Sequence, residues 1–343
     1  WLPPRLLGAD RNWEVGYALA RPETSAEQGP AIGLLIVLSG PSVASMRNTY
    51  DRFDEFTALA LPYVQLWRVG LGIVLTLALY LAGTLLFIAG SLFAFGDTSP
   101  EMAAFAVGEG VGQTSLSVFL LLATFAVLAA ALFLAVRICH KRGPGSLFGV
   151  VDGRARYFWT ATGVSLGVTG IAMAISLPFT DLTPNLATAR WVIFLLPALI
   201  LIAVQTGAEE LVFRGYLQQQ LGARFNGFLI WGLLPSVLFG VAHFEFASAG
   251  ASAPFVAIAA GLFGVVAADL TARTGSIMAA WGMHFANNLV AILGVGVPGS
   301  ITGLALYTTD MPLDDTEAIL PFLILDVVLT VLVWFLVRRV LRV

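Results

Sequence analysis

At residues 208–215 the chain reads AEELVFRG, and Glu209, Glu210 and Arg214 follow an apolar run that carries no charge from residue 191 onward. A helix needs ~20 apolar residues to cross a bilayer, and this run approaches that length. A charged side chain at the bilayer centre costs roughly 2.5–3.5 kcal/mol on insertion scales, so such groups usually face a protein interior or a water-filled cavity and serve a function. These three residues therefore mark a candidate active site.

Composition predicts an integral membrane protein. Charged residues make up 11% and hydrophobic residues 58% of the 343 residues, and the mean hydropathy is +0.87, whereas about a quarter of a soluble domain is charged. The formal net charge of −3 and the lack of a long basic run argue against nucleic acid as a partner. The single cysteine, Cys139, excludes an intrachain disulfide and a cysteine-based zinc site.

Long apolar stretches, separated by Gly, Pro or charge clusters, predict eight membrane-spanning helices. They lie at about 67–93, 115–138, 157–177, 191–213, 228–246, 254–272, 277–295 and 319–341. We therefore expect an all-α fold, a polytopic transmembrane helical bundle that occupies residues 67–343. Residues 1–66 mix prolines with charges and predict an N-terminal cytoplasmic tail, with an interfacial helix near Phe53 to Leu61.

The distribution of basic residues orients the predicted spans, because Arg and Lys near span ends are retained in the cytoplasm. Basic residues gather in alternate loops and at the C-terminal end: Arg137, Lys141, Arg142, Arg154, Arg156, Arg214, Arg224, Arg273, Arg338, Arg339 and Arg342. The other loops are mostly acidic. We expect both termini to be cytoplasmic, in a bacterial inner (cytoplasmic) membrane.

Two of the three histidines, His243 and His284, fall inside predicted spans, whereas His140 stands beside Lys141 in a basic loop and is expected to be solvated or to face lipid headgroups. A lone histidine in an apolar helix is more often a hydrogen-bonded packing residue than a functional one. The free-energy cost of several ionisable groups at membrane depth is lowest when they share one polar cavity. We therefore expect both histidines to meet Glu209 and Glu210.

Spacing supports a convergent site, because residues four apart lie on one helix face. This relation holds for Glu210 and Arg214, for Phe239 and His243, and for His284 and Asn288. Such a cavity could hold a water between Glu209 and His243.

In that arrangement, Glu209 would take a proton from the water as general base, while His284 and Asn288 would donate hydrogen bonds to the oxyanion of an attacked amide. The predicted reaction is peptide-bond hydrolysis. The remaining acids of the spans are Asp269, expected at the cytoplasmic interface near Arg273, and Asp326, a candidate for a hydrogen bond between helices.

The same side chains could also hold zinc, so no cofactor is certain from the sequence. A catalytic zinc commonly has three protein ligands and a water, and Glu209, His243 and His284 could supply them. The helical H-E-x-x-H pattern of many zinc proteases is absent. The sequence leaves a metal-free site and a zinc site open and slightly favours the first.

Three motifs in order resemble the CAAX prenyl protease type II family, the CPBP intramembrane proteases. They are E-E-x-x-x-R at 209–214, F-x-x-x-H at 239–243 and H-x-x-x-N at 284–288, within a resemblance that covers about 155–295. The resemblance implies an intramembrane protease whose cavity opens to the cytosol. It also implies that Glu209 and His243 activate water, that His284 and Asn288 hold the oxyanion, and that Glu210 and Arg214 support them.

Two function classes follow from these observations. The first is an intramembrane endopeptidase, a membrane-bound hydrolase that cleaves a membrane-associated or lipid-modified protein, or a small peptide. The alternative is a proteolytically inactive scaffold, assembly or immunity protein that keeps the protease fold and joins a membrane protein complex through residues 1–66. A transporter is a third, weaker interpretation, because the motifs need no transport to explain them.

Overall fold

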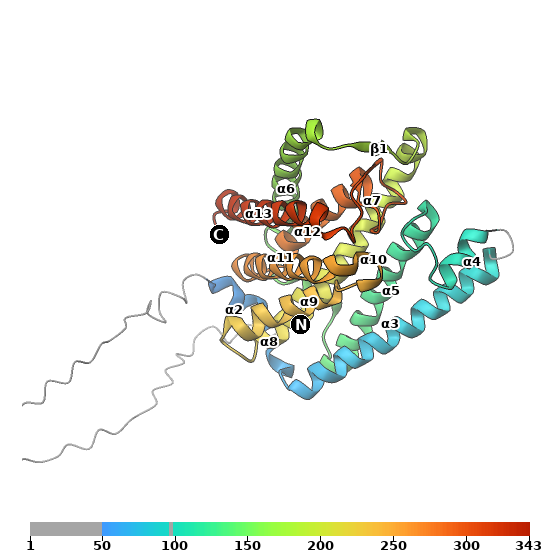
Figure 1. The fold of residues 1–343 in the computed structure, drawn as a ribbon. Helices are drawn as coiled ribbons and strands as arrows, with labels where there is room; N and C mark the ends of the chain where they lie inside the picture. Colours follow the sequence, from blue (N-terminus) through green and yellow to red (C-terminus); the bar gives the residue numbers. More distant parts are fainter. Residues whose placement is uncertain (1–49, 96–98) are drawn as a thin grey trace, which may run out of the picture. The chain divides into compact units, whose positions relative to one another are not determined.

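The computed structural model describes residues 50–95 and 99–343, and most of them are helical (Figure 1). The predicted tail therefore lies outside the described residues as far as residue 49. Among the described residues, six helices are long and apolar enough to cross a membrane. Their regular α-helical parts are α3 (Leu66–Phe95), α5 (Ser115–His140), α6 (Arg154–Ser176), α7 (Thr188–Glu210), α11 (Ala253–Thr274) and α13 (Thr316–Leu341).

The other two predicted spans, 228–246 and 277–295, are helical but shorter. The first is Leu229–Ala242, made of the π-helical η5 (Leu229–Leu233) and α9 (Leu234–Ala242). The second is α12 (Met278–Leu289), which continues into the π-helical η7 (Val290–Gly294). The count of eight spans and the cytoplasmic termini thus stay predictions.

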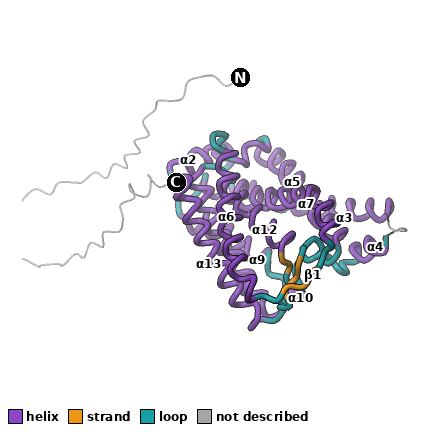
Figure 2. The backbone as a smooth tube through the Cα atoms, turned by 90° about the horizontal axis from the view of Figure 1, so that it is seen from above, coloured by secondary structure: helices purple, strands orange, loops and turns teal. Residues whose placement is uncertain are grey.

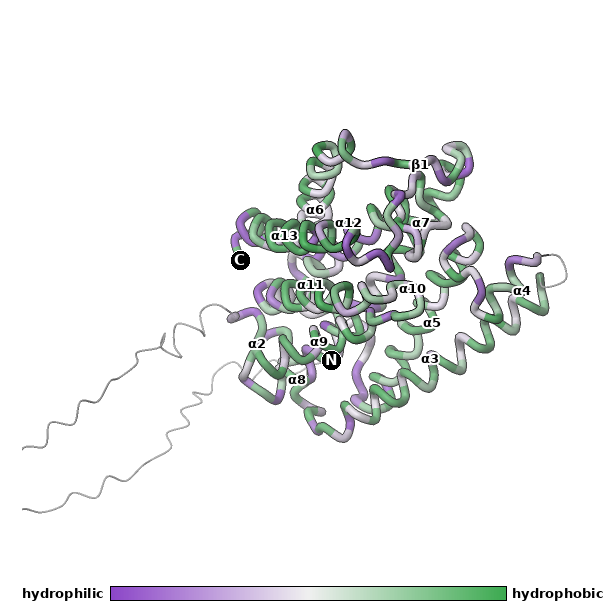
Figure 3. The backbone as a smooth tube through the Cα atoms, viewed as in Figure 1, coloured by the Kyte–Doolittle hydropathy of each residue, from purple (hydrophilic) through white to green (hydrophobic). Residues whose placement is uncertain are grey.

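Long apolar faces on these helices have no protein partner among the described residues. Phe93 and Leu86 of α3 are 96% and 74% exposed, and Figure 3 shows hydrophobic residues along nearly all of α3 and α13. Exposed apolar surface of this extent is stable only against lipid. The chain is an integral membrane protein.

Helix α12 packs against α6, α7 and α11, and α11 in turn packs against α9 and α13. The approach of α6 to α12 is close because residue 282 is glycine: a Cβ there would clash with the carbonyl oxygen of Phe158. The hydroxyl of Thr162 donates to the carbonyl of Gly282 at 3.1 Å across the same contact. A similar approach joins α9 to α11 at Gly240, where a Cβ would lie 2.5 Å from the carbonyl oxygen of Ala257.

The short helix α2 (Asp51–Ala58) falls where the sequence predicted an interfacial helix. Its Phe53 and Phe56 are buried, and the Phe53 ring lies 4.2 Å from the ring of Trp231. The carbonyl of Phe56 accepts a hydrogen bond from Gln219 on α8 (Gln219–Gly222). These contacts join α2 to η5 and α8, and α2 also packs against α11.

A three-stranded sheet, drawn in orange in Figure 2, was missed by the all-α prediction. Its order is β1 (Leu182–Pro184), β3 (Tyr307–Thr309), β2 (Val295–Gly296), with β1 antiparallel and β2 parallel to β3. Strands of two or three residues are too short to show a periodic pattern. The remaining short elements are η1 (Leu61–Tyr63), α4 (Pro100–Ala106), η2 (Pro144–Phe148), η3 (Leu177–Phe179), α10 (Phe246–Ala249) and η6 (Gly250–Ser252).

Candidate active site

Glu209 and Glu210 are the last two residues of α7, and the helix continues directly into the π-helical segment η4 (Leu211–Gln218). A π-helical turn is wider than an α-helical one and occurs frequently at functional sites. Glu210 is fully buried and Arg214 is 1% exposed. The acids thus end a regular helix at the point where its geometry changes.

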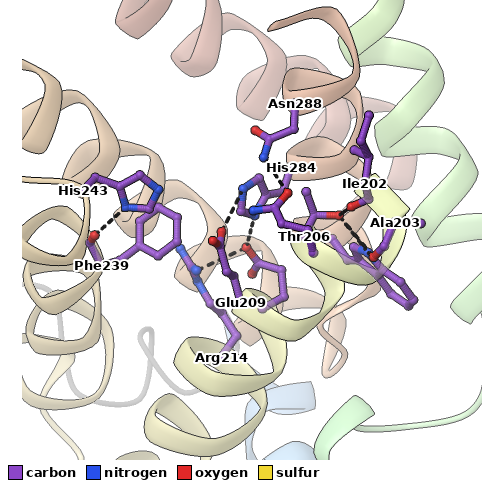
Figure 4. A network of polar contacts seen from close by, with 12 residues as sticks. Ile202, Ala203, Thr206, Glu209, Arg214, Phe239, His243, His284 and Asn288 are labelled. Carbon is purple, nitrogen blue, oxygen red and sulfur yellow. Dashed lines mark hydrogen bonds and ion pairs between the residues drawn. The ribbon is translucent and has the colours of Figure 1, made fainter. Parts of the chain in front are cut away.

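The predicted pair of Glu210 and Arg214 is confirmed. Arg214 Nη1 donates to Glu210 Oε1 at 3.1 Å, and His284 Nδ1 of α12 lies 2.8 Å from the same oxygen. Because a carboxylate only accepts, His284 Nδ1 carries a proton and donates it. The site thus ties α7 and η4 to α12 through one buried carboxylate (Figure 4).

Glu209 faces the other nitrogen of the same imidazole. Its Oε2 lies 3.4 Å from His284 Nε2 and has no hydrogen-bond partner that meets normal geometry among the described residues. Two bare acceptors at that distance would repel each other, so this geometry favours a proton on either Nε2 or the carboxyl group. The arrangement is a carboxylate, an imidazole and a second carboxylate in a row.

His243 follows the last residue of α9, and its ring orientation is fixed locally. Its Nδ1 donates to the carbonyl of Phe239 at 2.8 Å, which in the neutral ring leaves Nε2 as an acceptor. The Phe239 ring lies 4.4 Å from the His243 ring and 5.8 Å, edge to face, from the His284 ring. Arg214 lies over the same ring at 4.7 Å. Phe239 therefore contacts three of the polar groups that the sequence singled out.

Asn288 lies one turn beyond His284 on α12. Its Nδ2 donates to Gln205 Oε1 at 2.8 Å. Gln205, which the sequence analysis missed, is buried one turn before Glu209 on α7; the spacing of four is the signal that could have found it. One N–H of the Asn288 amide is thus occupied and the second is available.

A cavity of about 180 Å³ adjoins these groups, and His243, His284 and Asn288 all line it. Phe239 and Phe263 form part of its apolar wall, and Phe263 was also missed from the sequence although its ring lies 5.0 Å from that of His284.

The described residues contain no hydrogen bond or ion pair between Glu209 and His243, so the shared water between these two side chains stays a prediction. Oε2 of Glu210 and Nη2 of Arg214 are buried and, in the described part of the chain, have no hydrogen-bond partner.

The zinc ligand set suggested by the sequence does not fit this geometry. No three His, Cys, Asp or Glu side chains of the described residues are arranged to hold a metal ion. The Nδ1 contacts of His243 and His284 do not themselves prevent metal binding, because they leave Nε2 of each ring as the nitrogen that could bind a metal. Among the described residues, however, Glu209, His243 and His284 are not gathered around one point.

The expectation for His140 was wrong. The residue is fully buried, with Nε2 2.9 Å from the hydroxyl of Tyr216 and Nδ1 3.2 Å from the carbonyl of Tyr63. The partners belong to η1 and η4, which cover the end of α5. His140, which the sequence placed in an exposed loop, is therefore inside the fold.

Asp269 meets Arg273, as the sequence suggested, with an Oδ2 to Nε distance of 2.8 Å. It also accepts hydrogen bonds from the hydroxyl of Tyr50 and the indole nitrogen of Trp334, both at 2.8 Å. Burial, together with the nearby Asp269 carboxylate, raises the pKa of Tyr50 to about 12. This cluster links α11 to α13 and to the residue before α2.

The comparisons with known proteins cover the same part of the chain. Residues 189–290 match the family described as Type II CAAX prenyl endopeptidase Rce1-like, a family of proteases, which confirms the resemblance that the three motifs predicted. The match lies within the predicted core of 155–295 and contains Glu209, His243, His284 and Asn288.

A named relative is the "Uncharacterized protein YyaK" of Bacillus subtilis (strain 168), which is 37% identical over 115 residues. The alignment covers 34% of this chain and 38% of the relative, so the chain spans well under half the length of that protein. The comparison with solved structures gave no match.

Proposed function

We propose that this protein is an intramembrane endopeptidase that hydrolyses a peptide bond of a membrane-associated or lipid-modified protein, or of a small peptide, by means of a water activated by glutamate and histidine. The observation that carries the proposal is the row of Glu210, His284 and Glu209, in which His284 lines a cavity together with His243 and Asn288. The match to a family of proteases over 189–290 supports the same reaction.

The side chains can divide the reaction as follows. His243 Nε2 accepts a hydrogen bond from the attacking water and orients it, while Glu209 takes the proton that the water loses. The hydroxide adds to the amide carbon, and the carbonyl becomes an oxyanion. Once Glu209 holds a proton, it no longer competes as an anion for the Nε2–H of His284, which donates to that oxyanion together with the second N–H of Asn288. Glu209 then delivers its proton to the leaving amine.

The buried partners hold these groups in place. Glu210 fixes the tautomer and direction of His284, and Arg214 balances the charge of Glu210. Gln205 positions the amide of Asn288. The substrate reaches these groups within a lipid bilayer. We propose that this bilayer is a bacterial cytoplasmic membrane and that both termini of the protein lie on its cytoplasmic side. The Bacillus relative supports the bacterial setting. In this proposal residues 1–66 also bind further membrane proteins.

The test is cleavage of fluorogenic peptides, farnesylated and unmodified, by the full chain in liposomes. Glu209→Gln and His243→Ala should each lower kcat/KM by roughly 10²–10⁴-fold, the range that a positioned acid–base group contributes. Glu245→Gln is the matched control, because this exposed acid lies two residues from His243 and does not line the cavity. Wild-type rates in both site variants would refute the proposal. If the wild-type chain cleaves no peptide and the Glu209→Gln variant performs the cellular role as well as the wild-type chain does, the result favours the scaffold.

A further inference from the structure

One acidic residue on the wall of the cavity lies outside the family match. Asp326 on α13 lines the cavity of about 180 Å³, as does Leu323 one turn earlier, whereas the family match ends at residue 290. The same cavity is lined by His243, His284 and Asn288. A carboxylate that the proposed reaction does not use is therefore open to the space in which that reaction would occur.

Asp326 has no hydrogen bond or ion pair within residues 50–95 and 99–343. The contrast with Asp269 is informative, because that carboxylate is bonded to Tyr50, Arg273 and Trp334. An acid that stabilises the packing of membrane helices needs such partners, since an unpaired charge at membrane depth is costly. The predicted hydrogen bond from Asp326 to another helix is absent from the described residues, so a packing role does not explain this side chain.

A second, smaller cavity also touches Asp326. It measures about 20 Å³ and is lined by the hydroxyl-bearing Ser165, Thr169 and Thr330 and by Asn287. A volume of this size is enough for roughly one water. Of these two cavities, only the larger one has room for a ligand group beside Asp326.

The larger cavity suits a side chain rather than a whole ligand. Pockets that enclose a drug-sized molecule measure roughly 300–1,000 Å³, and this one is smaller. Apart from Asn287, its remaining walls are apolar, with Val256, Ala259 and Ala260 of α11 contributing to them. An apolar stem that ends in a cationic group matches apolar walls and one free carboxylate, as Lys and Arg side chains do.

We propose that Asp326 binds a positively charged group of the substrate, a Lys or Arg side chain or a free amine, and so directs cleavage to peptides with a cation close to the scissile bond. This inference rests on the proposed function, because Asp326 can direct cleavage only if the protein is a protease. The recognition itself is a binding event, so it can be measured without cleavage.

The experiment uses fluorescent single-span peptides of Leu and Ala in which one Lys is moved residue by residue, each paired with a norleucine version. Binding is measured to the full chain carrying Glu209→Gln, in micelles. At one Lys position we expect tighter binding than for norleucine by roughly 10–100-fold, the worth of a hydrogen bond to a charged group. Adding Asp326→Asn should remove that preference, and Asp326→Lys should transfer it to a probe with Glu at that position.

Glu317→Gln is the matched control, because it removes one acid from the same helix about 13 Å away along the axis and does not line the cavity. With Glu317→Gln added, the preference for the Lys probe should equal that of the chain that carries Glu209→Gln alone. All variants should show the same helical circular dichroism as that chain. An unchanged Lys preference in Asp326→Asn, or no preference at any Lys position, overturns the inference.

Cleavage of the same probes by the wild-type chain separates the two proposals. A Lys preference in binding without cleavage leaves the role of Asp326 standing and counts against the protease. Cleavage that ignores the charge of the probe supports the protease and overturns the role of Asp326.

Discussion

Exchanging Glu210 for glutamine should destabilise the folded protein strongly, because it leaves Arg214 buried without its ion-pair partner. Arg214 is 1% exposed and Glu210 is fully buried, with 3.1 Å between Nη1 and Oε1. Removing one partner of a buried pair costs about 3–5 kcal/mol. Arg214→Met should cost a similar amount, since it leaves the Glu210 carboxylate with His284 alone.

The double variant Glu210→Gln/Arg214→Met should be no less stable than either single variant. It buries no unpaired charge, and the glutamine oxygen can still accept from His284 Nδ1. If each single change costs about 3–5 kcal/mol and the pair costs no more than one of them, the coupling energy is about −3 kcal/mol or more negative.

The ion pair between Asp269 and Arg273 provides the comparison. It has the same spacing of four, but its side chains are 10% and 14% exposed, and Asp269 keeps Tyr50 and Trp334 as donors when Arg273 is changed. Arg273→Met should therefore cost about 1 kcal/mol, close to the value of an exposed pair.

The assay is the free energy of unfolding from SDS titration in mixed micelles, followed by circular dichroism. Additive effects of Glu210→Gln and Arg214→Met, within about 0.5 kcal/mol, would refute the coupling. An Arg273→Met cost as large as that of Arg214→Met would show that burial does not set the difference.

Three further changes test individual contacts: one between helices, one hydrogen bond to Asp269 and one hydrogen bond from Asn288. Gly282→Leu should abolish the proposed cleavage and lower the melting temperature, because any side chain there meets the Phe158 carbonyl. Gly170→Leu is the control, because the space at its Cβ position is open. Equal melting temperatures of the two variants would contradict the close α6–α12 contact. Tyr50→Phe should cost about 1 kcal/mol in SDS unfolding through the lost bond to Asp269, and no change would show that bond to be unimportant. Gln205→Leu should lower kcat more than it raises KM, because Asn288 loses its acceptor; a change in KM alone would contradict the positioning role.

Helices and the centre of the site were readable from the sequence because both rest on local rules. Apolar runs of membrane length predict helices, and a spacing of four placed Glu210 beside Arg214. The same rules named His284 but gave no distance to either glutamate. That distance depends on how α7 and α12 pack, which is set by Gly282 and by contacts remote in the sequence.

Other features depend on tertiary contacts that no local pattern encodes. His140 stands in a basic stretch, so solvent was the natural expectation, yet Tyr63 and Tyr216 from two other segments cover it. Gln205 looks like one polar residue in an apolar helix until Asn288 is placed opposite it. The short strands carry too few residues for any periodic signal.

The π-helical segment η4 makes the length of this part of the chain matter more than its composition. Side chains within it reach fixed partners: the amide of Gln218 donates to the carbonyl of Ala268, and the hydroxyl of Tyr216 donates to the carbonyl of Val69. Each residue of an α-helix turns by about 100°, so deleting one residue from 211–218 would rotate these side chains away from their partners or rotate Glu209 and Glu210 away from His284. Homologous chains should therefore vary the residues of this segment freely at exposed positions while keeping their number constant.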